Sequence, residues 1–138
     1  MQKSWRESII DKLVKKLSFL KSETTLSAIS WITVFVVIVF MSGFIYIITT
    51  ENPIPIIFLQ TGAIRVFLWS INMQTHAETI VVMLYYLMGA GGVLLYMTAI
   101  TRTYNPRTLK YMLFFSFLLI LLASLGLYSA YTSKFTPP

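Results

Sequence analysis

The sequence predicts an all-α integral membrane protein with three transmembrane helices, an N-terminal amphipathic interfacial helix and an apolar first loop. Of the 138 residues 57% are apolar, and they come in long blocks, which is typical of membrane proteins. Residues 24–50, 79–101 and 111–133 are uncharged runs of 27, 23 and 23 residues. At about 1.5 Å per residue, a helix of such length crosses a hydrocarbon core of roughly 30 Å.

The composition excludes several functional classes. The chain has no cysteine, which excludes disulfides, CxxC redox centres and thiolate metal sites. Its net charge of +6 lies outside the long apolar runs, so we expect membrane orientation rather than binding to nucleic acid. The first 21 residues are charged throughout and lack the apolar core of a signal peptide, so no cleavable signal is expected.

Residues 1–21 are predicted to form an amphipathic helix on the cytoplasmic side of the membrane. Ile9, Leu13 and Leu17 recur at a spacing of four, and lysines lie largely on the other side. A basic amphipathic helix beside a span favours an interfacial position, with an alternative role as a docking helix for a cytosolic partner. The lysines expected at the membrane surface are Lys12, Lys15 and Lys16.

The first transmembrane helix is expected over residues 26–48. Trp31 and Tyr46 suit the two membrane interfaces, and Ser42 with Gly43 forms a small pair that another helix could approach closely. Pro53 then disfavours further helix.

Residues 51–77 form the predicted non-cytoplasmic loop, which is unusually apolar. A fourth span there would bury Arg65 at a cost of about 2.5–3.5 kcal/mol. We expect instead two short extended segments about Gly62, or a kinked interfacial element. Apolar loop residues need a lipid or protein cover, and the residues expected in that contact are Phe67, Leu68 and Trp69.

The second transmembrane helix is expected over residues 78–101 and carries a distinctive face of glycines and tyrosines. Without water to exclude, membrane helices associate through close packing, which small residues permit. The pattern therefore predicts a packing site, either for the other spans or for another subunit. Its residues are Tyr85, Gly89, Gly92, Tyr96 and Ala99, with Gly91 beside them.

A cytoplasmic loop is expected over residues 102–110, followed by the third transmembrane helix over 111–132. Ala123, Gly126 and Ala130 line one face of that helix and permit close contact. Nine of the eleven Lys and Arg residues lie in the N-terminal segment and the second loop. The positive-inside rule then predicts a cytoplasmic N-terminus and a non-cytoplasmic C-terminus.

No catalytic, cofactor or metal site is expected. Apart from Glu78, the first residue of the second span, no charged residue lies within the predicted spans, where proton relays and ion pathways usually need one. His76 is the only histidine, which excludes sites built on a pair of histidines. Glu51, His76 and Glu78 have no motif spacing, so they are interpreted as polar groups near a helix N-terminus. The sequence therefore favours an interaction protein.

Three groups of residues carry a resemblance to a family. They are similar to that family's Gly-Gly-Ile-Ile-Tyr with Glu-Pro-Pro, its Phe-Leu, Asn-Gly-Gln and Glu series, and its Met-Gly-Gly-Leu-Gly with a later Pro-Asn turn. The matching segments are 42–46 with 51–53, 67–68 with 72–74 and Glu78, and 88–92 with 105–106. In order and spacing they resemble OSTC-like small subunits of the oligosaccharyltransferase complex, and the membrane part of its thioredoxin-bearing subunits. Met73 stands where the family has glycine, and the segment before Phe67 is shorter.

The resemblance implies a non-catalytic accessory subunit for protein N-glycosylation. Its implied partners are the catalytic oligosaccharyltransferase subunit, other subunits of the complex, the protein-conducting channel and membrane lipids, with no cofactor and no nucleic acid. It implies the endoplasmic reticulum membrane for a eukaryotic protein and the plasma membrane for an archaeal one. A translocon-associated protein outside glycosylation, and a channel or transporter component, stay open as alternatives.

Overall fold

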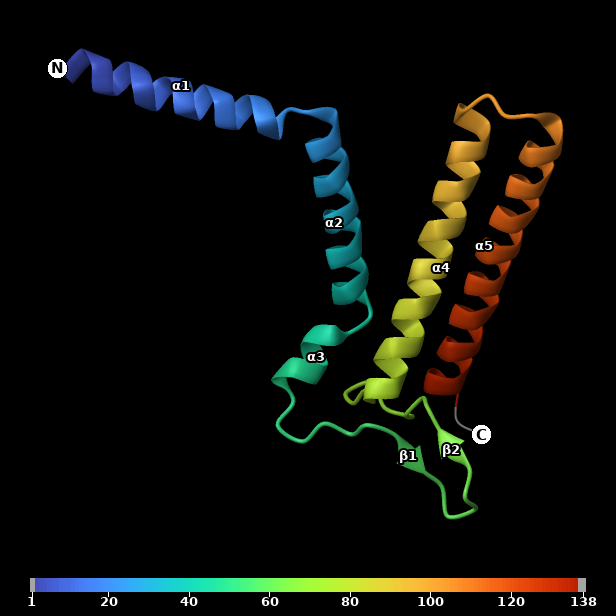
Figure 1. The fold of residues 1–138 in the computed structure, drawn as a ribbon. Coiled ribbons are helices and arrows are strands. Elements are labelled where there is room, and N and C mark those ends of the chain that lie inside the picture. The colour runs from blue at the N-terminus through green and yellow to red at the C-terminus, as the bar shows by residue number, and fades with distance from the viewer. Residues whose placement is uncertain (1, 137–138) are drawn as a thin grey trace. The chain divides into compact units, whose positions relative to one another are not determined.

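A computed structural model describes the backbone of residues 2–136 and the side chains of residues 7–19 and 21–136. Met1 and the side chains of Lys3 and Arg6, which belong to the predicted N-terminal segment, lie outside the described part. The chain divides into two compact units, Met1–Val37 and Ile38–Pro138. Its elements in order are α1 (Gln2–Leu20), α2 (Glu23–Met41), α3 (Phe44–Thr49), β1 (Ile57–Phe58), β2 (Ile64–Arg65), α4 (His76–Thr101) and α5 (Pro106–Phe135) (Figure 1).

The fold is mostly helical, and α2, α4 and α5 are long and apolar enough to cross a membrane, by length and composition alone. That part of the predicted fold class is confirmed. Only 6% of the most apolar window of α2, 6% of that of α4 and 11% of that of α5 is buried within the chain. These helices therefore turn most of their apolar side chains outward, where lipid or another protein must cover them.

The predicted N-terminal helix is present as α1, which the structure extends from Gln2 to Leu20. Its apolar residues, Ile9 and Leu13 among them, are exposed, and so are Lys12, Lys15 and Lys16. Ser22 begins the next helix, because its hydroxyl lies 2.6 Å from that of Thr25 and its carbonyl accepts from the amide of Leu26. Helix α2 therefore begins at Glu23, three residues before the predicted start of the first span at residue 26.

The single helix expected over residues 26–48 is instead divided into α2 and α3. Gly43 separates them in a left-handed conformation (φ 84°) that suits glycine and ends a helix. The Gln74 amide nitrogen donates a hydrogen bond of 2.7 Å to the carbonyl of Ser42, which α2 leaves without a helical partner. A loop contact from 32 residues away therefore stabilises the break, and the predicted uninterrupted span is corrected.

The apolar first loop folds into two short extended segments, the first of the two expected arrangements. The strands β1 and β2 pair antiparallel, with Ile57 opposite Arg65 and Phe58 opposite Ile64. Gly62 takes a positive φ of 82° in the turn between them, and its amide donates to the carbonyl of Leu59. This hairpin adds a small β element to the predicted all-α fold.

The helices α4 and α5 form a hairpin closed by a short loop that ends at Pro106, the first residue of α5 (Figure 1). The buried residues of α4 include Glu78, Gly92 and Ala99, which with the half-buried Tyr85 recur every seven residues. Those of α5 recur with the same period and are Ser116, Ala123 and Ala130. A seven-residue repeat keeps one seam in contact along both helices, and small residues let the backbones approach.

Glycine contacts fix the register of this seam. A Cβ placed on Gly89 would lie 3.4 Å from that of Ala123, and one on Gly92 would lie 2.8 Å from Cγ1 and 3.1 Å from the amide nitrogen of Ile120. Moving three residues forward along α4, from Gly89 to Gly92, therefore moves the contact three residues back along α5, from Ala123 to Ile120. An antiparallel pair of helices requires this relation. An added Cβ at Gly126 would overlap the ring of Tyr85, with Cδ1 of that ring 2.6 Å away.

Replacing Gly92 with leucine should destabilise the hairpin by about 1–3 kcal/mol, because the Ile120 backbone cannot move aside as a flexible side chain can. Gly91→Leu is the matched control, since a Cβ at Gly91 meets nothing within 4 Å. Thermal unfolding of the full chain in detergent measures both variants. Equal loss of stability in the two would contradict the assigned seam.

Candidate functional site

A polar cluster lies where α4 begins, and Thr75 organises it. Its hydroxyl donates to the carbonyl of Val66 at 2.6 Å and accepts from the amide of Glu78 at 3.1 Å. The amides of His76 and Ala77 donate to the carbonyls of Ile54 and Pro55. The first N–H groups of α4 therefore all have partners within the chain, and this helix N-terminus is closed to an external anion.

Gln74 connects the cluster to the end of α2. Its amide nitrogen donates to the carbonyl of Ser42 and to the hydroxyl of Thr79, both at 2.7 Å. Ser42 and Thr79 are each only 2% exposed. Because buried polar groups are costly without partners, these bonds tie the loop, α2 and α4 to one another. We use the name polar cluster for Ser42, Gln74, Thr75, Glu78, Thr79 and Lys134.

An ion pair between Glu78 and Lys134 closes the α4–α5 hairpin at its open end. The Lys134 ammonium also donates to the carbonyl of Met73 at 3.1 Å. The Glu78 side chain is 4% exposed and that of Lys134 16% exposed. The second carboxylate oxygen, Oε2, is buried without a hydrogen-bond partner, as is Nδ1 of His76. The carboxylate therefore depends on Lys134 for compensation of its buried charge.

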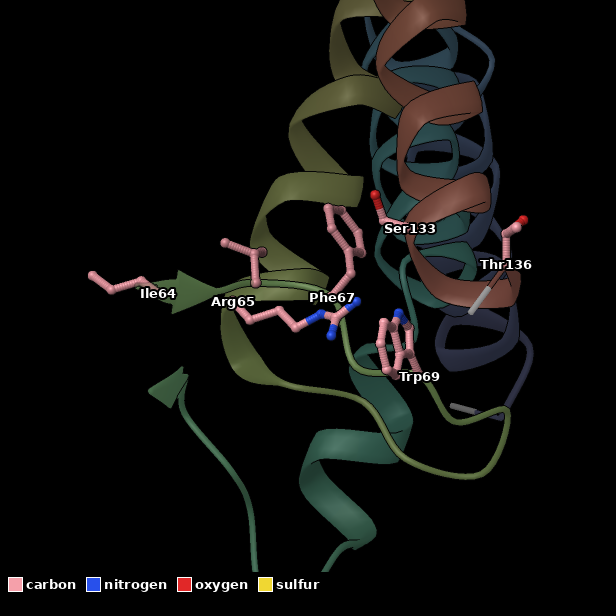
Figure 2. Close-up of a pocket in the computed structure, with 7 residues that line it drawn as sticks. Ile64, Arg65, Phe67, Trp69, Ser133 and Thr136 are labelled. Atoms are coloured by element: carbon pink, nitrogen blue, oxygen red, sulfur yellow. The ribbon is translucent and has the colours of Figure 1, made fainter. Parts of the chain in front are cut away.

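Beside the cluster, β2 and the segment that follows it form a pocket of about 240 Å³ against the end of α5. Figure 2 shows the Arg65 side chain reaching from β2 to the ring of Trp69, with Ser133 and Thr136 on the end of α5. The guanidinium carbon lies 3.5 Å from the ring centroid of Trp69, a cation–π contact. The pocket thus combines a cation, an aromatic face and two hydroxyls.

The structure places the residues predicted for helix packing in different settings. Gly89, Gly92, Ala99, Ala123, Gly126 and Ala130 lie at the α4–α5 seam, and Tyr85 packs on Gly126. Gly91 is exposed and lies outside that contact, and Tyr96 is 45% exposed. Ser42 and Gly43 contact Gln74 rather than a helix. Of the predicted loop contacts, Phe67 and Leu68 are half-buried and Trp69 is exposed. The face expected to pack on a neighbour is thus used largely within the chain.

Sequence reasoning missed the roles of Thr75, Gln74 and Lys134. It placed Glu78 at a helix N-terminus but gave it no partner. One signal was available: Glu78 lies 11 residues before Gly89, and Lys134 lies 11 residues after Ala123. An antiparallel pair in which Gly89 meets Ala123 therefore brings the two charges together.

Among residues 2–136, no group of three or more His, Cys, Asp or Glu side chains is placed so that it could hold a metal ion. The polar cluster is held by its own hydrogen bonds, and the Arg65 pocket opens to the outside. Comparison of the chain with protein-family models, curated proteins and solved structures found no match.

Removing Lys134 should destabilise the protein by about 3 kcal/mol, because a carboxylate buried in the fold is left uncompensated. Lys134→Met should lower the free energy of unfolding more than Glu78→Gln does. Lys134→Met leaves the buried Glu78 carboxylate unpaired, whereas Glu78→Gln leaves the more exposed Lys134 ammonium, which can reach water. The double variant should recover much of the loss. Denaturant unfolding in micelles measures this, with the exposed Lys110→Met as control. Additive effects of the two substitutions would exclude the pairing.

Proposed function

We propose that this protein is a non-catalytic scaffold subunit of a membrane complex, which packs its spans against a larger membrane partner. The observation that carries the proposal is the outward apolar surface of α2, α4 and α5, of which at most 11% of each most apolar window is buried within the chain. The polar side chains with long-range bonds instead gather in the polar cluster at one end. Such a molecule offers a shaped apolar surface and a rigid polar end, which suits assembly better than chemistry.

The partner we propose is the catalytic subunit of an oligosaccharyltransferase complex, which this protein would link to the protein-conducting channel. The ordered resemblance of residues 42–46, 72–74 and 88–92 to OSTC-like subunits supports this choice. Gln74 belongs to one of those segments and ends α2 by bonding to Ser42 in another. The residues that carry the resemblance therefore include structural contacts of the fold.

A channel or transporter component is the less favoured candidate. A conducting path between helices needs polar or ionisable lining groups. The seam between α4 and α5 is filled by glycine, alanine and the Tyr85 ring, with Ser116 bonded to the carbonyl of Leu113 at 2.9 Å. Such close packing supports a scaffold. A translocon-associated protein outside glycosylation shares these features and differs in its partner.

A tagged full-length chain, solubilised in mild detergent, should co-purify with a large membrane subunit and with oligosaccharide transfer to an acceptor peptide. Quantitative mass spectrometry and the transfer assay measure the two. Recovery of the chain alone would overturn the scaffold proposal. Recovery with the protein-conducting channel but without transfer activity would instead support the translocon-associated alternative.

We propose that the N-terminus and the α4–α5 loop lie on the cytoplasmic side and the first loop on the other, as the 9 to 2 division of Lys and Arg favours. Since the chain has no cysteine, single-cysteine variants report position without background. In sealed membrane vesicles with the cytoplasmic face outward, an impermeant maleimide should label Lys12→Cys and Thr103→Cys but not Thr61→Cys, all at exposed positions. Labelling of Thr61→Cys and Thr103→Cys from one side would contradict this topology.

A further inference from the structure

Two pockets of different character share Trp69 as a common wall. The first, of about 240 Å³, is lined by Arg65, Ser133 and Thr136 together with residues of the loop. The second, of about 340 Å³, is lined by Ile71, Lys134 and Phe135 among others. Both lie against the C-terminal end of α5, on either part of the Trp69 segment.

The charge of the first pocket is not compensated within the described chain. No carboxylate of the described residues lies within ion-pair distance of Arg65, whose guanidinium is held on the face of Trp69. The hydroxyls of Ser133 and Thr136 likewise have no recorded hydrogen-bond partner among these residues, so they are open to a ligand. In the second pocket, by contrast, the charge of Lys134 is paired with that of Glu78. The two pockets together therefore present a single unpaired positive charge.

The surroundings of the pockets are those of a membrane interface. The aromatic rings of Tyr131 and Phe135 pair at 4.9 Å on the last turns of α5, and Trp69 lies exposed beside them. Tryptophan and tyrosine are enriched at the level of lipid headgroups, where an apolar ring meets polar groups. The uncharged run of α5 ends at this point, because Lys134 in the last turn of the helix is charged.

We propose that the two pockets form one site for a phosphate-bearing amphiphile, an anionic phospholipid. The guanidinium of Arg65 offers paired N–H donors that match a phosphodiester, and Ser133 and Thr136 add two hydroxyl donors. The glycerol and the first acyl carbons lie against Trp69, Ile71 and Phe135. One positive charge matches the single negative charge of a phosphodiester. The site rests on the proposed membrane crossing but not on the identity of the protein partner.

The test uses the full chain in an uncharged maltoside detergent, with Trp5→Phe and Trp31→Phe so that Trp69 is the only tryptophan and can be excited apart from the eight tyrosines. Dihexanoylphosphatidylglycerol should change Trp69 emission saturably, and dihexanoylglycerol, which lacks the phosphate, should not. Arg65→Gln should weaken the binding by about tenfold or more, as expected for loss of a charge-assisted bidentate contact. Arg102→Gln, at an exposed position beyond α4, should leave it unchanged.

Each outcome decides the proposal. Equal responses to dihexanoylglycerol and the phospholipid, or an unchanged affinity in Arg65→Gln, overturn it and leave Arg65 for an acidic protein partner. If inorganic phosphate alone changes the Trp69 emission saturably, the pocket binds a phosphate group, but its ligand is free phosphate and the phospholipid assignment is wrong. If Arg65→Gln fails to unfold cooperatively, Arg65→Lys and Ser133→Ala carry the test, and affinity unchanged in both overturns the site. Because no partner is present, failure here is distinct from failure of the scaffold proposal.

Discussion

The close approach of α4 and α5 is the constraint on which the rest of this structure depends. In a bilayer the lipid tails are as apolar as the side chains, so the hydrophobic effect does not drive two spans together. The spans are held instead by close packing and by polar contacts. Gly92 lies directly against the backbone of Ile120, and Ala123 lies opposite Gly89. A side chain larger than these would separate the helices, so the small residues at seven-residue spacing decide that the hairpin exists in this form.

The polar cluster holds together the open end of that hairpin, where α4 begins and α5 ends. The ion pair between Glu78 and Lys134 forms in the same register as the glycine contacts and so adds to them. Glu78 and Lys134 meet at the open end, and Gln74 joins the same region to the carbonyl of Ser42. The loop of residues 51–75 is thereby held against α4, although its own hairpin pairs only two residues on each strand. The same contacts bring Arg65 and Trp69 beside the end of α5.

The functional proposals follow from this division of the molecule. Most of the small residues that the sequence suggested for contact with a partner lie buried between α4 and α5. The surface left for assembly is therefore the large apolar exterior of the spans. At the loop end the exposed ring of Trp69 carries the half-buried guanidinium of Arg65 on its face. A lipid headgroup and a protein partner would thus meet different parts of the chain.

The sequence by itself determined the number of long apolar helices, the small-residue faces and the position of the turn at Gly62, because length, hydropathy and glycine content are local properties. Only the tertiary structure decided that α2 ends at Met41, that Glu78 pairs with Lys134 and that Arg65 lies on Trp69. The first depends on a bond from the Gln74 side chain to a backbone carbonyl 32 residues away, and the second on two side chains 56 residues apart. Such contacts leave no periodic trace in the sequence, because their energy arises only once the helices are packed.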